Sequence, residues 1–241
     1  MGDDTQRVAV VFAGGDPPHA GALDDVPDDA CSIAADSGLE HASALGRRVD
    51  LVVGDLDSVR PEVLAAAERA GTRVERHPTA KDATDLELAL DAARDAGCGR
   101  IVVIGGHGGR VDHFVANLLL LGSPRLRGAS VEARFPGGTV HVVRDALEIR
   151  GVPGDVVSLL PVGGAAHGVT TEHLRYPLRG ETLHPGSTRG VSNELLATRA
   201  RVTLTDGTLL AVEPHMGPER SGGLLGEREA EAERTIGEEQ S

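Results

Sequence analysis

The stretch Leu51-Val52-Val53-Gly54-Asp55-Leu56-Asp57-Ser58 places a short apolar run directly before two carboxylates. Its three apolar residues, two of them β-branched, predict the end of a buried strand that turns at Gly54. If the extended geometry persists, Asp55 and Asp57 point the same way, because side chains alternate along a strand. Two carboxylates held this close repel each other unless a cation lies between them, and Mg²⁺ typically takes one or two carboxylates together with phosphate oxygens. A lone Asp-x-Asp is more often a solvated turn, so the rest of the chain must decide.

The composition limits the class of protein. The 241 residues carry 24 basic and 37 acidic side chains, for a net charge of −13, which argues against a nucleic-acid or membrane surface but not against a nucleotide neutralised by a metal. Cys31 and Cys98 each lie in or beside an apolar run, which favours small core residues over a disulfide framework. The acidic N-terminus predicts neither a signal peptide nor a spanning helix. We therefore expect a cytoplasmic protein.

Strands alternate with helices through about residue 122. Apolar runs predict strands at Arg7–Phe12, Cys31–Ala35, Leu51–Val53, Arg73–Arg76 and Ile101–Ile104. Helical patterns follow them: a short one to about Leu45, one from Pro61 to Ala70, one opened by Thr84 that stops at Gly97, and one to about Leu121. This order predicts βαβ units and a parallel α/β (Rossmann-like) sheet, in which ligands bind beyond the carboxyl ends of the strands.

The pattern changes after the strand expected at Val131–Phe135. Short β-type runs separated by turn signals follow, at Val140–Val143, Val156–Leu160, Val169–Thr171, Ala200–Leu204 and Leu209–Val212. They predict a small antiparallel β-sandwich or barrel. We divide the chain into an α/β domain at 1–137, a β-domain at 138–213 and a disordered acidic tail at 214–241.

Other polar clusters also follow predicted strands. Asp36 follows the second strand, and Lys81, the only lysine beside 23 arginines, precedes Asp85. A compact ammonium and a planar guanidinium are not interchangeable. We therefore favour a functional role for Lys81 over a chance occurrence. Thr84 and Glu87 match a capping box, so Asp85 either serves the helix N-terminus alone or completes a metal site with Asp55 and Asp57. Because all these residues follow strands, we favour the metal site.

The loop Gly105–Asp112 joins a strand to a helix. Glycines let backbone N–H groups approach phosphate, and the helix N-terminus favours anions. The loop matches neither a dinucleotide fingerprint nor a P-loop, because Val111 stands where a third glycine would be needed and no Gly-Lys-Ser/Thr follows. Arg110 can contact phosphate in a bidentate way. Asp112 and His113 remain open between function and a purely structural role.

Taken together, these segments resemble the ordered motifs of the thiamine pyrophosphokinase family across roughly residues 7–213. The motifs of the first half are Asp36-Ser37-Gly38, Gly54-Asp55-Leu56-Asp57-Ser58, Lys81-Asp82-Ala83-Thr84-Asp85-Leu86-Glu87 and Gly105 to His113. In the second half, Gly168 to Leu178 and Gly190-Val191-Ser192-Asn193-Glu194 resemble that family's thiamine-binding β-domain. The resemblance implies transfer of a pyrophosphoryl group from ATP to the hydroxyethyl group of thiamine, and a homodimer that holds thiamine near the subunit interface.

The resemblance also implies roles for individual residues. Mg²⁺ would be held by Asp55, Asp57 and Asp85, while Lys81 and Arg110 would neutralise the charge that develops as AMP leaves. Asp112 or a metal-bound carboxylate would accept the hydroxyl proton. Ser192 and Asn193 would hydrogen-bond the aminopyrimidine. The remaining ligand-binding candidates in the matching motifs are Asp36, Gly38, Ser58, Thr84, Gly106, Gly108, Gly109 and His113.

Two alternatives stay open at this point. A pyrophosphokinase acting on a pterin alcohol would use the same chemistry, although Tyr176-Pro177-Leu178 and Ser192-Asn193 favour thiamine. The other is a non-catalytic nucleotide sensor, against which stand the acidic residues that a metal site needs.

Overall fold

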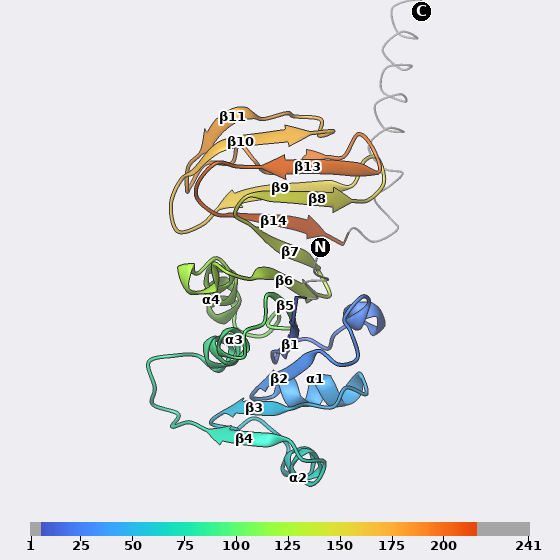
Figure 1. Cartoon of the computed structure of the whole chain (residues 1–241), viewed down its shortest axis with the longest axis vertical. Coiled ribbons are helices and arrows are strands. Elements are labelled where there is room, and N and C mark those ends of the chain that lie inside the picture. The colour runs from blue at the N-terminus through green and yellow to red at the C-terminus, as the bar shows by residue number, and fades with distance from the viewer. Residues whose placement is uncertain (1–5, 216–241) are drawn as a thin grey trace, which may run out of the picture.

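The computed structural model describes residues 6–215, which form one long sheet with helices at one end and a second sheet at the other (Figure 1). The ten-stranded sheet has the order β12-β9-β14-β7-β6-β5-β1-β2-β3-β4, and the four-stranded sheet has the order β11-β10-β13-β8. The expected combination of a parallel α/β part and an antiparallel β part is confirmed.

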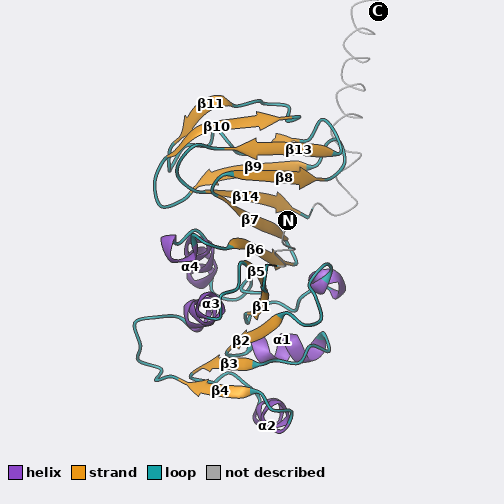
Figure 2. Ribbon diagram, in the orientation of Figure 1, coloured by secondary structure: helices purple, strands orange, loops and turns teal. Residues whose placement is uncertain are grey.

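Six parallel strands carry the α/β part (Figure 2). They are β1 (Val8–Phe12), β2 (Cys31–Ala35), β3 (Leu51–Gly54), β4 (Arg73–Arg76), β5 (Arg100–Ile104) and β6 (Ser130–Phe135). The helices are the short η1 (Ala20–Leu23) and η2 (Pro124–Leu126), and α1 (Gly38–Ala44), α2 (Pro61–Arg69), α3 (Asp85–Asp95) and α4 (Val111–Leu121). Each expected strand and helix of this part is present, with ends that move by one or two residues.

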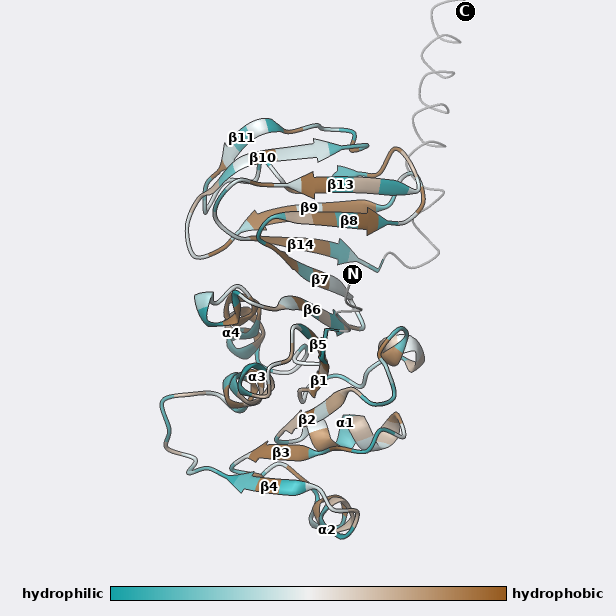
Figure 3. Cartoon of the chain, viewed as in Figure 1, coloured by the Kyte–Doolittle hydropathy of each residue, from teal (hydrophilic) through white to brown (hydrophobic). Residues whose placement is uncertain are grey.

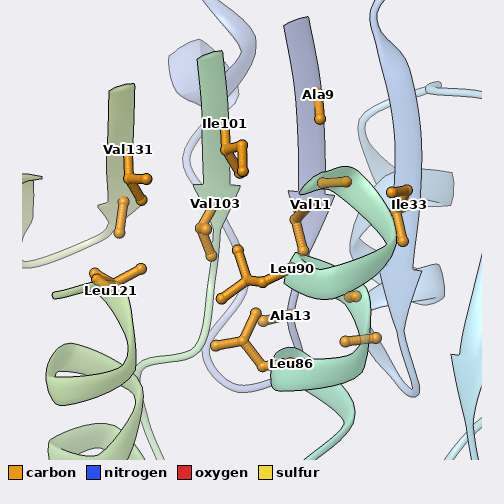
Figure 4. Packing of buried hydrophobic residues seen from close by; sticks show 14 of the residues in the cluster. Ala9, Val11, Ala13, Ile33, Leu86, Leu90, Ile101, Val103, Leu121 and Val131 are labelled. Carbon is orange, nitrogen blue, oxygen red and sulfur yellow. The ribbon is translucent and has the colours of Figure 1, made fainter. Parts of the chain in front are cut away.

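Two apolar layers enclose the parallel strands. On one face, Leu86 and Leu90 of α3 pack with Val11 and Val103 in one buried cluster (Figure 4). On the other face, Leu39 of α1 and Leu64 of α2 belong to a second cluster. The strand β4 is hydrophilic (Figure 3), and charged residues of this kind keep an edge strand from pairing with another chain.

The helix α3 begins where its sequence predicts. The Thr84 hydroxyl accepts a hydrogen bond from the Glu87 N–H, 3.2 Å away. The Glu87 carboxylate pairs with Arg125 of η2. Thr84 therefore caps the helix as expected, while the Glu87 side chain joins α3 to η2. The helix α2 begins at Pro61, where a missing N–H costs nothing.

The β part continues the same sheet rather than standing beside it. The hairpin between β6 and β7 reverses the chain at Gly138, and four antiparallel strands extend the sheet beyond β6. These are β7 (Gly138–Val143), β14 (Leu209–Pro214), β9 (Val156–Pro161) and β12 (Asn193–Glu194). The reversal falls where the sequence predicts the change from α/β to β, so the two halves share a backbone ladder.

A second sheet packs on this extension to form a sandwich. It contains β8 (Ala146–Arg150), β10 (Ala166–Glu172), β11 (Arg179–Leu183) and β13 (Arg199–Thr203), and both sheets contribute to one buried cluster. The sequence analysis did not predict β8, β11 or β12. Two residues of the tail expected from 214 are part of the described fold, because Pro214 pairs with Gly138 and His215 bonds to Gly137. The rest of that tail lies outside the described residues.

Candidate active site

Three carboxylates from three segments meet at the carboxyl edge of the parallel strands. Asp36 follows β2, Asp55 follows β3, and Asp85 is the first residue of α3. One ligand oxygen from each lies within 4.8 Å of the other two. Asp36 Oδ1 is buried without a hydrogen-bond partner, and Asp85 Oδ1 is buried with the Lys81 ammonium beside it. Buried carboxylate oxygens without donors are costly, and a hard cation with oxygen ligands would satisfy them.

The backbone at Gly54 makes this convergence possible. Gly54 has φ +146°, and a Cβ placed there would lie 3.1 Å from Asp85 Oδ1 and 3.2 Å from Asp36 Cβ. Any side chain at this position would intrude among the carboxylates. Asp36 itself has φ +46°, an uncommon conformation for a residue with a side chain. Its N–H bonds to Val53 O at 2.9 Å, which holds the end of β2 against β3.

The Asp57 carboxylate lies apart from these three, so the expectation that Asp55 and Asp57 point the same way is wrong, while a role of Asp57 at the metal stays a prediction. Leu56 has φ +62° and is buried, so the strand does not continue and the alternation of side chains ends at Gly54. The Asp57 carboxylate instead is exposed and accepts a hydrogen bond from the Ser58 hydroxyl at 2.9 Å. Asp36, expected only as a ligand-binding residue, takes the third position. The carboxylates that the structure brings together are therefore Asp36, Asp55 and Asp85, here called the carboxylate cluster.

Lys81 supplies positive charge to the carboxylate cluster. Its Nζ lies 3.0 Å from Asp85 Oδ1 and 4.0 Å from Asp55 Oδ2, and the side chain is 14% exposed. The ammonium also donates to Pro78 O at 3.2 Å. The lone lysine of the chain therefore sits at the acidic site, as its position in the sequence suggested.

The environment separates the proton affinities of two of the carboxylates. Burial, followed by the charges of Asp85, Asp55 and Asp57, raises the pKa of Asp36 above its ordinary value. Burial also opposes ionisation of Asp55, but hydrogen bonds from Thr79 and from the Asp57 N–H, with the charge of Lys81, outweigh it and lower that pKa. Burial therefore decides the direction for Asp36, and hydrogen bonds decide it for Asp55.

The loop after β5 is glycine-rich and tightly held. Gly105, Gly106, Gly108 and Gly109 all have positive φ. The Gly106 N–H bonds to Gly14 O and the Asp16 N–H bonds to His107 O, both at 2.7 Å, so the loops after β5 and β1 form one unit. A Cβ on Gly105 would lie 2.4 Å from Ala13 O, whereas one on Gly109 would meet nothing within 4 Å. The loop therefore presents an open, left-handed backbone at Gly109.

Two side chains that the sequence analysis did not assign support this loop. Asn117 of α4 donates from Nδ2 to Gly106 O at 2.9 Å. The His107 ring lies 3.0 Å from Asp16 Oδ2 and stacks on Phe135 with ring centroids 5.4 Å apart. The i, i+11 spacing of Gly106 and Asn117 gives no recognisable signal, and the pairing depends on how α4 returns to the loop.

The start of α4 carries the remaining candidates of this half. Arg110 Nε donates to Asp112 Oδ1 at 3.1 Å, and both side chains are exposed, at 70% and 64%. The hydrogen bond from Arg110 lowers the pKa of Asp112 to about 2. His113 is exposed, and Thr84 serves as the N-cap of α3. Gly38 lets α1 approach β1, because a Cβ there would lie 2.1 Å from Phe12 O.

The two candidates of the β part differ in what they can offer a ligand. The buried Asn193 amide accepts from the N–H groups of Tyr176 and Glu194 and donates to Tyr176 O, at 2.8–3.0 Å. These bonds tie the segment at Tyr176 to β12 and leave one N–H of the Asn193 amide, so the expected contact with the aminopyrimidine stays a prediction. Ser192 is exposed, while Tyr176 beside it is 52% exposed.

Comparison with known proteins finds two family models and several relatives that this chain is similar to. A family model described as "Thiamin pyrophosphokinase, catalytic domain" matches residues 26–132, and one described as "Thiamin pyrophosphokinase, vitamin B1 binding domain" matches residues 140–209. Together they cover well over half of the chain. A thiamine pyrophosphokinase of Bacillus subtilis is 29% identical over 171 residues, which are 66% of this chain and 75% of that protein.

Solved structures agree in fold. The crystal structure of the Bacillus subtilis thiamine pyrophosphokinase has a TM-score of 0.76 and 25% identity, covering 86% of this chain and 99% of that one. The thiamin pyrophosphokinase of Geobacillus thermodenitrificans has a TM-score of 0.74 and 25% identity, covering 88% and 99%. Within residues 6–215, no helix is both long and apolar enough to span a membrane.

Proposed function

The chain belongs to the thiamine pyrophosphokinase family, and we propose that it transfers pyrophosphate from ATP to thiamine at the carboxylate cluster. The observation that carries this placement is the convergence of Asp36, Asp55 and Asp85, with Asp36 Oδ1 buried and without a donor. Pyrophosphoryl transfer needs positioning and charge neutralisation more than covalent help from the protein. A site built from acidic groups, one ammonium and a glycine loop fits that need.

Mg²⁺ suits the carboxylate cluster, and when bound it would neutralise charge on the triphosphate. Asp36, Asp55 and Asp85 would hold it. We keep Asp57 and Ser58 in the proposal. Both are exposed beside Asp55 and would contact ATP with its bound metal. Lys81, next to Asp85 and Asp55, would neutralise charge on the phosphates.

The glycine loop and the start of α4 would bind the phosphates. The open backbone at Gly109 is placed for N–H contacts with an anion, with Gly106 and Gly108 as its neighbours. Arg110 can leave its exposed partner Asp112 to pair with phosphate. The hydrogen bond from Arg110 is what lowers the pKa of Asp112, so Asp112 regains proton affinity once Arg110 binds phosphate, and the base is either Asp112 or a metal-bound carboxylate.

We assign thiamine recognition to the β part. The order of strands in the sheet then implies that a second copy of the chain takes part. Ser192 and Asn193 lie at β12, seven strand spacings from β2 in the ten-stranded sheet. At about 4.8 Å per spacing this is roughly 30 Å, too far for one small substrate to touch both. We therefore propose a homodimer in which residues 1–137 of one protomer supply the chemistry and residues 138–213 of its partner hold thiamine.

Exposed apolar surface supports this dimer. Val111, Val115 and Leu119 of α4 follow an i, i+4, i+8 spacing and are 75%, 49% and 57% exposed. A stripe on one helix face beside the glycine loop is typical of a protein interface. In the β part, Tyr176 and Val191 expose apolar surface next to Ser192. Contact between these two surfaces would bring thiamine to ATP.

Release of AMP from ATP tests the function. Purified protein with Mg²⁺ and ATP should form AMP only when thiamine is added, with thiamine diphosphate in equal amount. A pterin alcohol in place of thiamine should give none; AMP formed with the pterin alone would favour that alternative. ATP binding without AMP formation would favour the nucleotide sensor. We also propose a cytoplasmic location, in keeping with the neighbouring thiols of Cys31 and Cys98, which are both free.

A further inference from the structure

A second polar cavity lies at the opposite edge of the sheet from the carboxylate cluster. Its volume is about 340 Å³, and it is lined by the start of β6, the end of β7 and the start of β8. Ser130 in its wall pairs with Arg100, the first residue of β5, whereas the glycine loop follows Ile104, the last. At about 3.3 Å per residue, roughly 13 Å of strand separates the two sites.

Two arginines line this cavity, and no acidic residue does. Arg127 and Arg144 are among its lining residues, which include no Asp or Glu. Within residues 6–215, neither arginine forms a salt bridge, while the nearby Arg125 pairs with both Glu87 and Asp91. The chain has an excess of acidic residues, so two cations left together without an acidic partner are unusual.

Arg144 is poorly satisfied where it stands. Its terminal nitrogen donates to Ser123 O at 3.2 Å, but its Nε is buried and has no hydrogen-bond partner. Burial, and then the positive charge of Arg127, lower the pKa of Arg144. An anion in the cavity would remove the repulsion between the two guanidinium groups.

We propose that this cavity binds a small phosphate-bearing ligand between Arg127 and Arg144. Two unopposed positive charges match a phosphate dianion better than a carboxylate, and the guanidinium fork fits phosphate oxygens. The volume suits a small metabolite, and Val142 and Leu147 provide apolar wall for its remainder. His141, also in the wall, is engaged by Glu213 at 3.0 Å and is not needed for the anion.

Titration with inorganic phosphate tests this site. Isothermal titration in EDTA, without nucleotide, removes binding that depends on a metal at the carboxylate cluster, and any phosphate held by the glycine loop and Arg110 would be equal in wild type and in the variants below. The wild-type chain should bind phosphate, and Arg127→Gln or Arg144→Gln should raise its Kd roughly tenfold to a hundredfold. Arg48→Gln is the matched control, because Arg48 is an exposed arginine without a salt bridge within residues 6–215, and it should leave the Kd unchanged.

Several outcomes would overturn the proposal. These are a wild-type chain that binds no phosphate at about 20 mM, a Kd equal in Arg127→Gln and wild type, or an equal loss in Arg48→Gln. Since Arg127 is exposed, its variant should fold and decide the matter even if Arg144→Gln does not. Acetate is the second probe: it should bind at least about tenfold more weakly than phosphate, and equal affinity would contradict a site for a dianion.

Discussion

Single residues at the carboxylate cluster give up stability for function. Asp36 Oδ1 is buried without a donor, and Asp36 and Leu56 adopt left-handed backbone conformations. Each of these features is unfavourable in a chain without its ligands. The metal and phosphate groups proposed for this site would offset them.

Metal affinity should distinguish the role of Asp85 from that of Asp57. We expect Asp85→Asn to weaken Mn²⁺ binding at least about tenfold in the absence of ATP, because it removes a charged ligand from the carboxylate cluster. Asp57→Asn should change the same Kd by less than about threefold, although turnover with ATP should still fall. Mn²⁺ titration followed by electron paramagnetic resonance measures both. A larger loss of metal affinity in Asp57→Asn than in Asp85→Asn would place the metal elsewhere.

The raised pKa of Asp36 predicts a pH-dependent gain on its removal. The folded state holds this proton more tightly than the unfolded chain, so the stability it contributes is present below the ordinary pKa of 3.8 and is lost as the pH rises through the raised value. In EDTA at pH 7, Asp36→Asn should therefore melt a few degrees above wild type, and the gap should close below pH 4. Thermal melts across this range measure the gap; one that does not change with pH would contradict the assignment.

At the scale of elements, local pattern decided what the sequence could predict. The strands β1, β2, β3 and β5 are apolar runs closed by glycine or aspartate, and the cap of α3 is encoded by Thr84, so these elements could be predicted. The missed strands β8 and β11 each contain charged residues, with few buried positions, and β12 has two residues. These segments become strands because neighbouring strands pair with them, and the local sequence gives no sign of that pairing.

The same reasoning explains which site residues could be predicted. The position of Asp36, Asp55, Lys81 and Asp85 at one edge follows from the order of strands and helices. The separation of Asp57 from the carboxylate cluster depends on the backbone of Leu56. The hydrogen bonds of Asn193 depend on Tyr176, seventeen residues away. Both are tertiary details that spacing along the chain does not encode.

The glycine loop gives a prediction with a matched control. Gly109 and Gly97 both have positive φ, at +65° and +74°, and a Cβ on either would meet nothing within 4 Å. Alanine at either position should therefore cost a similar amount of stability, about 1–2 kcal/mol. Only Gly109→Ala should weaken ATP binding, by about tenfold or more, because its Cβ would enter the proposed phosphate site. Equal ATP affinities in the two variants, measured by titration, would show that this loop does not bind the phosphates.

At the scale of the whole molecule, one sheet joins the two halves. The ladder continues from β6 to β7 and on to β12, so a hinge between the halves would break backbone hydrogen bonds. The long sheet keeps the two ends of a single chain apart (Figure 1). We therefore expect the proposed activity to require two chains.

The stripe on α4 predicts the state of assembly. Leu119→Glu should convert the dimer to a folded monomer with little activity, because a charge at a buried interface carries a large desolvation cost. Val152→Glu is the control, since Val152 is 60% exposed on the turn between β8 and β9, and it should remain a dimer. Sedimentation velocity distinguishes them. A wild-type monomer, or a dimeric Leu119→Glu, would contradict this interface.

The most direct test of the account mixes two inactive chains. Asp55→Asn removes the metal site of one chain, and Tyr176→Ala removes the proposed thiamine surface of the other. Each homodimer should be inactive, but a heterodimer isolated with two different tags contains one site built from two unaltered halves. It should show about half of the wild-type thiamine-dependent AMP release per dimer. A heterodimer as inactive as its parents would show that the carboxylate cluster and the thiamine surface do not meet across two chains.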